Sequence, residues 1–189
     1  YSRAVYERRA EVEGVTGVLA GSAEEAIALS EQGVISVLVD PEARVRKIWQ
    51  PEVVIDAIMA KNNIGTTLTD APLVLALGPG FRARTDCHAV IETMRGENLG
   101  RPIYKGSAIP NTGVPGMVGG YARERLIKAS GDGRMEPVAA IGDIVEKGSV
   151  LAYTGGEPVY AQIDGVIRGM LQAGVPVKKG MKIGDVDPR

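Results

Sequence analysis

Residues 129–152, ASGDGRMEPVAAIGDIVEKGSVLA, align without a gap on residues 161–184, AQIDGVIRGMLQAGVPVKKGMKIG, a displacement of 32 positions. Each copy has short apolar runs separated by glycines, which favour turns that need a positive φ. One copy is too small to close a hydrophobic core, so the repeat predicts a pseudo-two-fold β-sandwich domain over residues 125–189. The coinciding residues are Asp132 and Asp164, Gly133 and Gly165, Gly142 and Gly174, Lys147 and Lys179, and Gly148 and Gly180.

The repeat resembles the barrel-sandwich hybrid domains that carry biotin or lipoate in acyl-transfer enzymes, over about residues 125–187. Those carriers present a lysine at the tip of the hairpin that joins the two halves. Here that connection, YTGGEPVY at residues 153–160, has no lysine. A ligase needs an exposed primary amine to acylate, so we expect no attachment of biotin or lipoate and interpret the domain as a structural or docking module.

Residues 1–124 predict an α/β domain. SAEEAIALSEQG, from residue 22, has a capping serine, acidic residues in the first turn and apolar residues at helical spacing, as a helix requires. The runs at residues 34–40, 52–60 and 71–81 are nearly continuous in apolar residues, which is typical of parallel strands buried on both faces. We therefore expect a partly parallel sheet with flanking helices, a truncated Rossmann-like fold.

The first residues add a further expectation. RAVYE, at residues 3–7, alternates as a strand does, and the chain begins at Tyr1 without a methionine. We interpret the chain as a part of something longer.

The charge excludes some classes of partner. Lys and Arg number 22 against 23 Asp and Glu, for a net charge of -1. Without a positive field, nucleic acid and membrane surfaces are not expected partners. The first residues carry charges where a signal peptide needs an apolar core, and no apolar run is long enough to span a bilayer. We therefore expect a cytoplasmic protein. A single cysteine cannot form an internal disulfide.

Ligands of parallel sheets bind beyond the carboxyl ends of the strands. We therefore expect a site for an anionic ligand in the loops that follow the predicted strands. Gly78-Pro79-Gly80 offers backbone amides to an anion, although Pro79 removes one N–H, and the alternative is a tight connection alone. The long loop at residues 109–120 is either a linker or a binding loop. The candidate ligand-binding residues are Asp56, Lys61, Asn62, Gly78, Gly80, Arg95, Asn111 and Thr112.

The only cysteine and the only histidine are neighbours, at Cys87 and His88. If CHAVIET is a strand, the two side chains point to opposite faces and cannot form a catalytic dyad. Cys87 would then belong to the core, whereas a relay that transfers selenium or sulfur would need it exposed. Asp86, His88 and Glu92 would share the other face, as an acid and base set or as ligands of a cation, against the simpler alternative of a surface histidine.

Four blocks together resemble the selenium-dependent molybdenum hydroxylase system accessory family: residues 56–63, 77–101, 106–116 and 180–189. The sequence differs from that family in two respects. Family members begin with a nucleotide-binding-type segment, which we expect this chain to lack before Tyr1. The family's R-G-H-N-L-G-R also has Glu97 in place of the histidine.

The resemblance implies a role in maturing a molybdenum hydroxylase. The partners would be the hydroxylase or its cofactor-assembly proteins, and the ligand a nucleotide or a molybdopterin-type compound. The alternative is a scaffold that docks the hydroxylase without chemistry of its own. The metal, the reaction and a homo-oligomeric state are left open.

Overall fold

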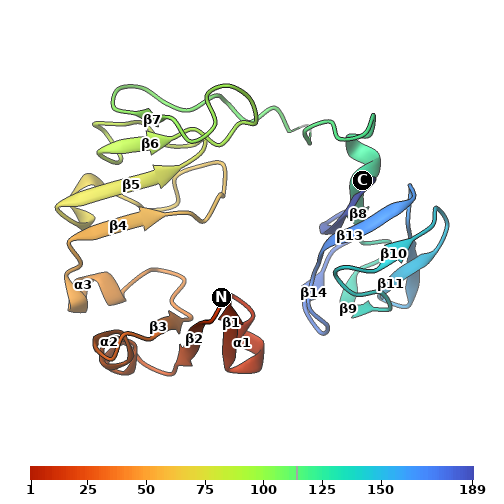
Figure 1. Cartoon of the computed structure of the whole chain (residues 1–189), viewed down its shortest axis with the longest axis horizontal. Helices are drawn as coiled ribbons and strands as arrows, with labels where there is room; N and C mark the ends of the chain where they lie inside the picture. Colours follow the sequence, from red (N-terminus) through yellow and green to blue (C-terminus); the bar gives the residue numbers. More distant parts are fainter. Residues whose placement is uncertain (114) are drawn as a thin grey trace. The chain divides into compact units, whose positions relative to one another are not determined.

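The computed structural model describes residues 1–113 and 115–189 (Figure 1). Contacts along the chain divide it into two compact units, Tyr1–Asn111 and Thr112–Arg189. Within the described residues, no helix combines the length and the apolar character that crossing a membrane requires.

The first unit begins with a small mixed sheet of order β1-β2-β3. Helix α2 connects the parallel strands β2 and β3, and it begins where predicted, because the Oγ of Ser22 accepts a hydrogen bond of 3.2 Å from the Glu25 N–H. The elements are α1 (Ala4–Glu7), β1 (Arg9–Val12), β2 (Val15–Ala20), α2 (Ala23–Glu31) and β3 (Ile35–Leu38). The strand predicted over RAVYE is wrong, since these residues form α1 with Ala4 buried.

A second mixed sheet follows, in the order β4-β5-β6-β7. β4, β5 and β6 are parallel, and β7 pairs antiparallel with β6. The elements are α3 (Val45–Trp49), β4 (Val53–Asp56), a 3₁₀ turn η1 (Leu68–Asp70), β5 (Leu73–Leu77), β6 (Ala89–Ile91) and β7 (Pro102–Ile103). Its buried core consists of Val74, Ala76, Phe81, Ala83, Cys87, Val90 and Ala108.

The predicted Rossmann-like α/β fold is wrong, because the described chain is mostly β and its three α-helices are short. Residues 57–72, whose one helical element is the short 3₁₀ turn η1, and the irregular residues 78–88 connect β4 to β5 and β5 to β6, where a Rossmann fold has α-helices. Val53 and Ile55 on β4 are 46% and 59% exposed, so this strand is covered on one face only. The apolar runs predicted parallel strands correctly, but an apolar run does not show which element packs on the strand.

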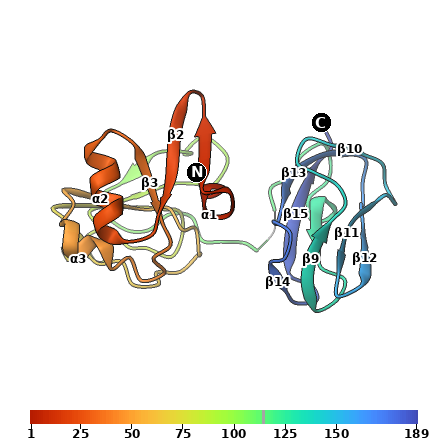
Figure 2. The ribbon, with the colours of Figure 1, turned by 90° about the horizontal axis from the view of Figure 1, so that it is seen from below.

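The second unit contains two antiparallel four-stranded sheets, of order β12-β11-β9-β14 and β10-β13-β15-β8 (Figures 1 and 2). Both contribute to one apolar core, with Met135, Leu151, Ile167 and Ile183 almost fully buried. Its elements are a 3₁₀ turn η2 (Arg123–Arg125), β8 (Leu126–Lys128), β9 (Gly133–Pro137), β10 (Ile144–Val145), β11 (Val150–Thr154), β12 (Glu157–Tyr160), β13 (Gly165–Met170), β14 (Pro176–Val177) and β15 (Lys182–Asp187).

The hydrogen bonds of this unit follow the 32-residue displacement. Asp164 Oδ1 accepts from the Lys147 N–H, and Asp132 Oδ1 accepts from the Lys179 N–H, both at 2.7 Å. The amides of Gly148 and Gly180 likewise donate to the carbonyls of Ala161 and Ala129, at 2.9 and 2.8 Å. Each repeat therefore closes the turns of the other, which is the physical basis of the pseudo-two-fold sandwich.

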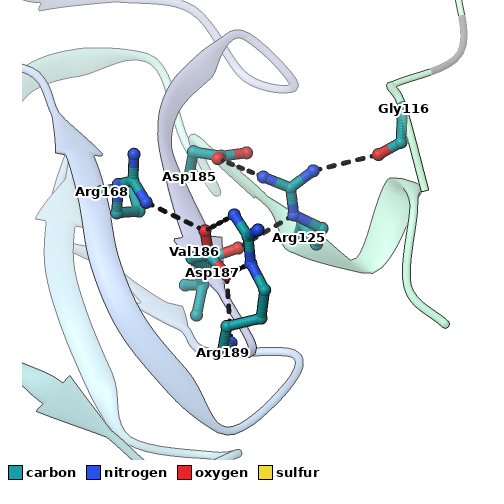
Figure 3. Close-up of polar contacts among 7 residues, drawn as sticks. All are labelled: Gly116, Arg125, Arg168, Asp185, Val186, Asp187 and Arg189. Atoms are coloured by element: carbon teal, nitrogen blue, oxygen red, sulfur yellow. Dashed lines mark hydrogen bonds and ion pairs between the residues drawn. The ribbon is translucent and has the colours of Figure 1, made fainter. Parts of the chain in front are cut away.

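At one end of the sandwich, arginine side chains bind the last strand (Figure 3). Arg125 is buried and donates to the Val186 carbonyl at 3.2 Å, to the Gly116 carbonyl at 3.0 Å and to Asp185 Oδ2 at 2.8 Å. Asp187 accepts from Arg189 and Arg168, and these contacts, above all the Arg189 side chain, hold the pKa of Asp187 well below its usual range. Arg125 thus ties residue 116 to β15.

Replacing either aspartate of the repeat tests this symmetry. Asp132→Ala and Asp164→Ala should each destabilise the sandwich by about 1 kcal/mol, because each removes the carboxylate that accepts from a turn amide of the other repeat. Hydrogen exchange of the amides in β8 to β15 measures the loss. Glu146→Ala, at an exposed position, is the matched control and should stay within about 0.5 kcal/mol of the parent. A loss at one aspartate only would contradict the energetic equivalence of the repeats.

Candidate functional site

The parallel pairing of β4, β5 and β6 brings three loops to one edge of the sheet. Asp56 at the end of β4 pairs with Ala76, and Leu77 at the end of β5 pairs with Ile91. The segments that follow Asp56, Leu77 and Ile91 are therefore neighbours. This carboxyl edge is the place where the sequence predicted a ligand.

The glycine turn after β5 lies against the loop after β4. A Cβ at Gly80 would lie 2.5 Å from the Asn62 Cα and 2.7 Å from the Lys61 carbonyl carbon, so only glycine fits there without a shift of the backbone. Gly78 lies in the same way against Thr93, whose Oγ1 would be 2.7 Å from a Cβ at residue 78. Both glycines have a positive φ, +81° at Gly78 and +107° at Gly80. Four of the candidate residues are thus brought together.

Asp56 closes the loop that contains Lys61 and Asn62. Its carboxylate is buried, and Oδ2 accepts from the Thr66 hydroxyl at 2.6 Å while Oδ1 accepts from the Ile58 N–H at 3.0 Å. A charge at a buried position is tolerated when hydrogen bonds replace water. Sequence reasoning missed Thr66, and its distance of 10 positions from Asp56 gives no periodic signal.

Glu92 is the second buried carboxylate of this edge, with 3% of its surface exposed. Oε1 accepts from the amides of Thr93 and Met94, and Oε2 accepts from the amide of Ile109, each at 2.8 Å. Burial alone would raise the pKa of Glu92, but the three amide hydrogen bonds together lower it. The side chain therefore fixes the loop after β6 to residue 109 as a carboxylate.

Asp86, His88 and Glu92 bind three different backbone segments. Asp86 Oδ2 accepts from the Arg82 N–H at 2.7 Å, and His88 Nδ1 accepts from the Val74 N–H at 2.9 Å. His88 thus lies at the amino end of β5 and β6, whereas Glu92 follows the carboxyl end of β6, about 13 Å away at 3.3 Å per residue. Strand alternation does not reach Asp86, because β6 begins only at Ala89.

Metal-ligating side chains do not gather in the described part of the chain, where no group of three His, Cys, Asp or Glu residues could hold an ion. Cys87 is fully buried, as predicted, and this burial raises the pKa of its thiol. A buried thiol with a raised pKa does not have the exposure that a relay of sulfur or selenium needs.

The remaining candidates lie in exposed segments. Arg95 is exposed three residues after Glu92, and Lys61 is exposed with a φ of +69°. Asn111 and Thr112 are exposed on either side of the division between the two units.

A hollow of about 600 Å³ opens beside Glu92. Arg101 lies on its wall and is exposed, and its Nη1 donates to the Asn98 Oδ1 at 3.2 Å. Tyr104 and Ser107 also line it, and sequence reasoning missed both because neither belongs to a recognisable motif. The guanidinium and hydroxyl groups could bind an anion there.

Comparisons with known proteins do not establish a family for this chain. No protein-family model matches it. It is 47% identical over its 189 residues to YqeB of Escherichia coli strain K12, described as an uncharacterized protein, and it spans 35% of the length of YqeB.

Two solved structures show a weaker likeness. One is an aspartoacylase family protein from Mesorhizobium loti, with 19% identity, a TM-score of 0.31, and coverage of 35% of this chain and 24% of the other. The second is a succinylglutamatedesuccinylase/aspartoacylase from Rhodobacter sphaeroides, with 20% identity, a TM-score of 0.30, and coverage of 35% and 23%. No inference rests on either.

Two glycine substitutions should separate close packing from backbone conformation. Gly80→Ala adds a Cβ that collides with the backbone at Asn62, and Gly65→Ala at a φ of +139° adds one that meets nothing within 4 Å. We expect a loss of about 1 kcal/mol for Gly65→Ala and about 3 kcal/mol for Gly80→Ala. Urea unfolding followed by the fluorescence of Trp49, the only tryptophan, measures both. Equal losses would contradict the close contact of the two loops.

Glu92 should make the stability of the first unit depend on pH. Its pKa is lowered in the folded chain, so its contribution is complete above the unfolded value of about 4.3 and is lost as the pH falls through the folded value. Glu92→Gln should therefore flatten the fall in stability between about pH 5 and pH 3. Urea unfolding by Trp49 fluorescence measures it, with the exposed Glu97→Gln as control. A slope unchanged in Glu92→Gln would contradict this role.

Proposed function

We propose that this chain is part of a cytoplasmic accessory protein that matures a selenium-dependent molybdenum hydroxylase, and that it binds an anionic ligand at the carboxyl edge of β4, β5 and β6. The ligand class is a nucleotide or a molybdopterin-type compound. One observation supports the site above the others: the loop at Lys61 and Asn62 lies in contact with the glycine turn at Gly80. The role in maturation is supported by the sequence resemblance alone.

The edge offers the groups that recognise phosphate. Lys61 follows β4 and Arg95 follows β6, and both are exposed cations. Arg101 adds a third cation on the wall of the hollow beside Glu92. Charge-assisted hydrogen bonds of this kind contribute about 1.5–3 kcal/mol each.

The carboxylates have a different role in this proposal. Glu92 and Asp56 accept hydrogen bonds from their own loops, so they hold the backbone that carries the cations. Toward the phosphate, both are positioning residues, and the proposal assigns them no proton transfer. Binding, without a catalysed reaction, is the activity that this arrangement supports.

Isothermal calorimetry with nucleotides and molybdopterin-type ligands tests the binding. Lys61→Ala and Arg95→Ala should each weaken a phosphate ligand about tenfold, because each removes one charge-assisted contact. Lys128→Ala, an exposed cation of the sandwich, should leave the affinity unchanged. Binding that is equally strong in all three variants would contradict the proposed edge.

The alternative is a scaffold that docks the hydroxylase. Its support is the exposed apolar surface of the sandwich, where Ile144 is 85% and Ile141 64% exposed. Two results together would favour the scaffold over the ligand site. The unmodified chain would bind no ligand in the calorimeter, and a chain with Asp86, His88 and Glu92 all replaced by alanine would retain the hydroxylase in a pull-down.

A further inference from the structure

A second hollow, of about 390 Å³, lies between α3 and β4, which is the edge strand of its sheet. Trp49, Ile55 and Ile58 on its wall are 44%, 59% and 63% exposed, so apolar side chains of the wall are open to solvent. Val54 and Pro51 add to that surface. A hollow of this size and lining is within the range that holds small organic ligands.

One charged group of the first candidate site also lines this hollow. Asp56 is 5% exposed, and each of its oxygens accepts one hydrogen bond from its own loop, from Thr66 and from the Ile58 amide. A carboxylate has about four lone-pair sites, so two acceptor sites remain. A mainly apolar hollow with a carboxylate in its wall suits a ligand that combines an apolar face with N–H donors.

The shape and the chemistry of the wall restrict the ligand further. An indole offers a flat face on which aromatic rings stack, and such pairs add about 0.5–1.5 kcal/mol beyond the buried area. Arg46 is on the same wall, where its Nε is 3.4 Å from Asp70 Oδ1, and Lys47 lines an adjoining hollow. The surroundings therefore suit a flat heterocycle with an anionic substituent better than a cation.

We propose that this hollow binds the ring of an amino-substituted planar heterocycle, such as a purine or a pterin, with Trp49 against its face and Asp56 accepting from its N–H groups. This inference takes its ligand class from the proposed function. There the carboxyl edge binds the phosphate of the ligand, and here the hollow binds its ring. Asp56 belongs to both places, since it ends β4 and lines the hollow. The phosphate groups would then extend toward the loop that carries Lys61.

Trp49 is the only tryptophan, so its fluorescence reports directly on this hollow. We would titrate the whole chain with guanosine and neopterin, which carry a ring and no phosphate, and separately with pyrophosphate, which carries phosphate and no ring. Both ring compounds should change the emission of Trp49 in a saturable manner. Pyrophosphate should bind in the calorimeter without that change.

Three variants locate the binding. Ile55→Ala and Ile58→Ala truncate exposed side chains and are not expected to unfold the chain, and each should weaken guanosine roughly fivefold to tenfold. Asp56→Asn should weaken it by a similar factor, because one acceptor becomes a donor. Ile144→Ala, at an isoleucine of the sandwich that is 85% exposed, is the control and should leave the affinity unchanged.

The outcomes separate the two proposals. Pyrophosphate binding without any response of Trp49 to the rings would overturn this inference and leave the proposed anion site standing. A Trp49 response that is the same in all three wall variants would overturn it as well. Ring binding without pyrophosphate binding would support the hollow and contradict the anion site, and no binding of either probe would overturn both.

Discussion

The parallel register of β4, β5 and β6 is the constraint on which the candidate site depends. Parallel strands end at the same edge, so their following loops meet there whatever the loops contain. Asp56 ends β4, and the Gly78–Gly80 turn and Glu92 follow β5 and β6, so this pairing brings the three to one edge. The contact of Gly80 with Asn62 then fixes how closely the loops approach.

The buried carboxylates organise this edge in a way that the sequence pattern did not indicate. Asp and Glu near strand ends suggested acids, bases or metal ligands. In the structure Glu92 accepts from three backbone amides and Asp86 accepts from one, so these side chains replace the hydrogen bonds that irregular loops lack. His88 does the same for the Val74 amide. A polar side chain that accepts from backbone amides in this way is less available to bind a ligand or transfer a proton.

The Rossmann-like interpretation was wrong for a physical reason that applies beyond this chain. A run such as residues 71–77 is apolar enough for a strand, and the strand is there. A Rossmann fold also needs helices between its strands. Residues 57–72 are rich in Asn and Thr, and residues 78–88 begin with Gly-Pro-Gly, so neither connection has helical periodicity. The composition of these connections is evidence against a Rossmann fold, even though the strands are present.

By itself, the sequence determined the local features: the capped helix α2, the apolar runs that form parallel strands, and the 32-residue repeat. These follow from periodicity, capping and turn chemistry, which act over a few residues. Only the tertiary structure decided which faces stay uncovered, which carboxylates bind the backbone, and that Trp49 shares a hollow with Asp56. Those facts depend on contacts between segments that are distant along the chain or joined by irregular loops, where no short-range pattern carries the information.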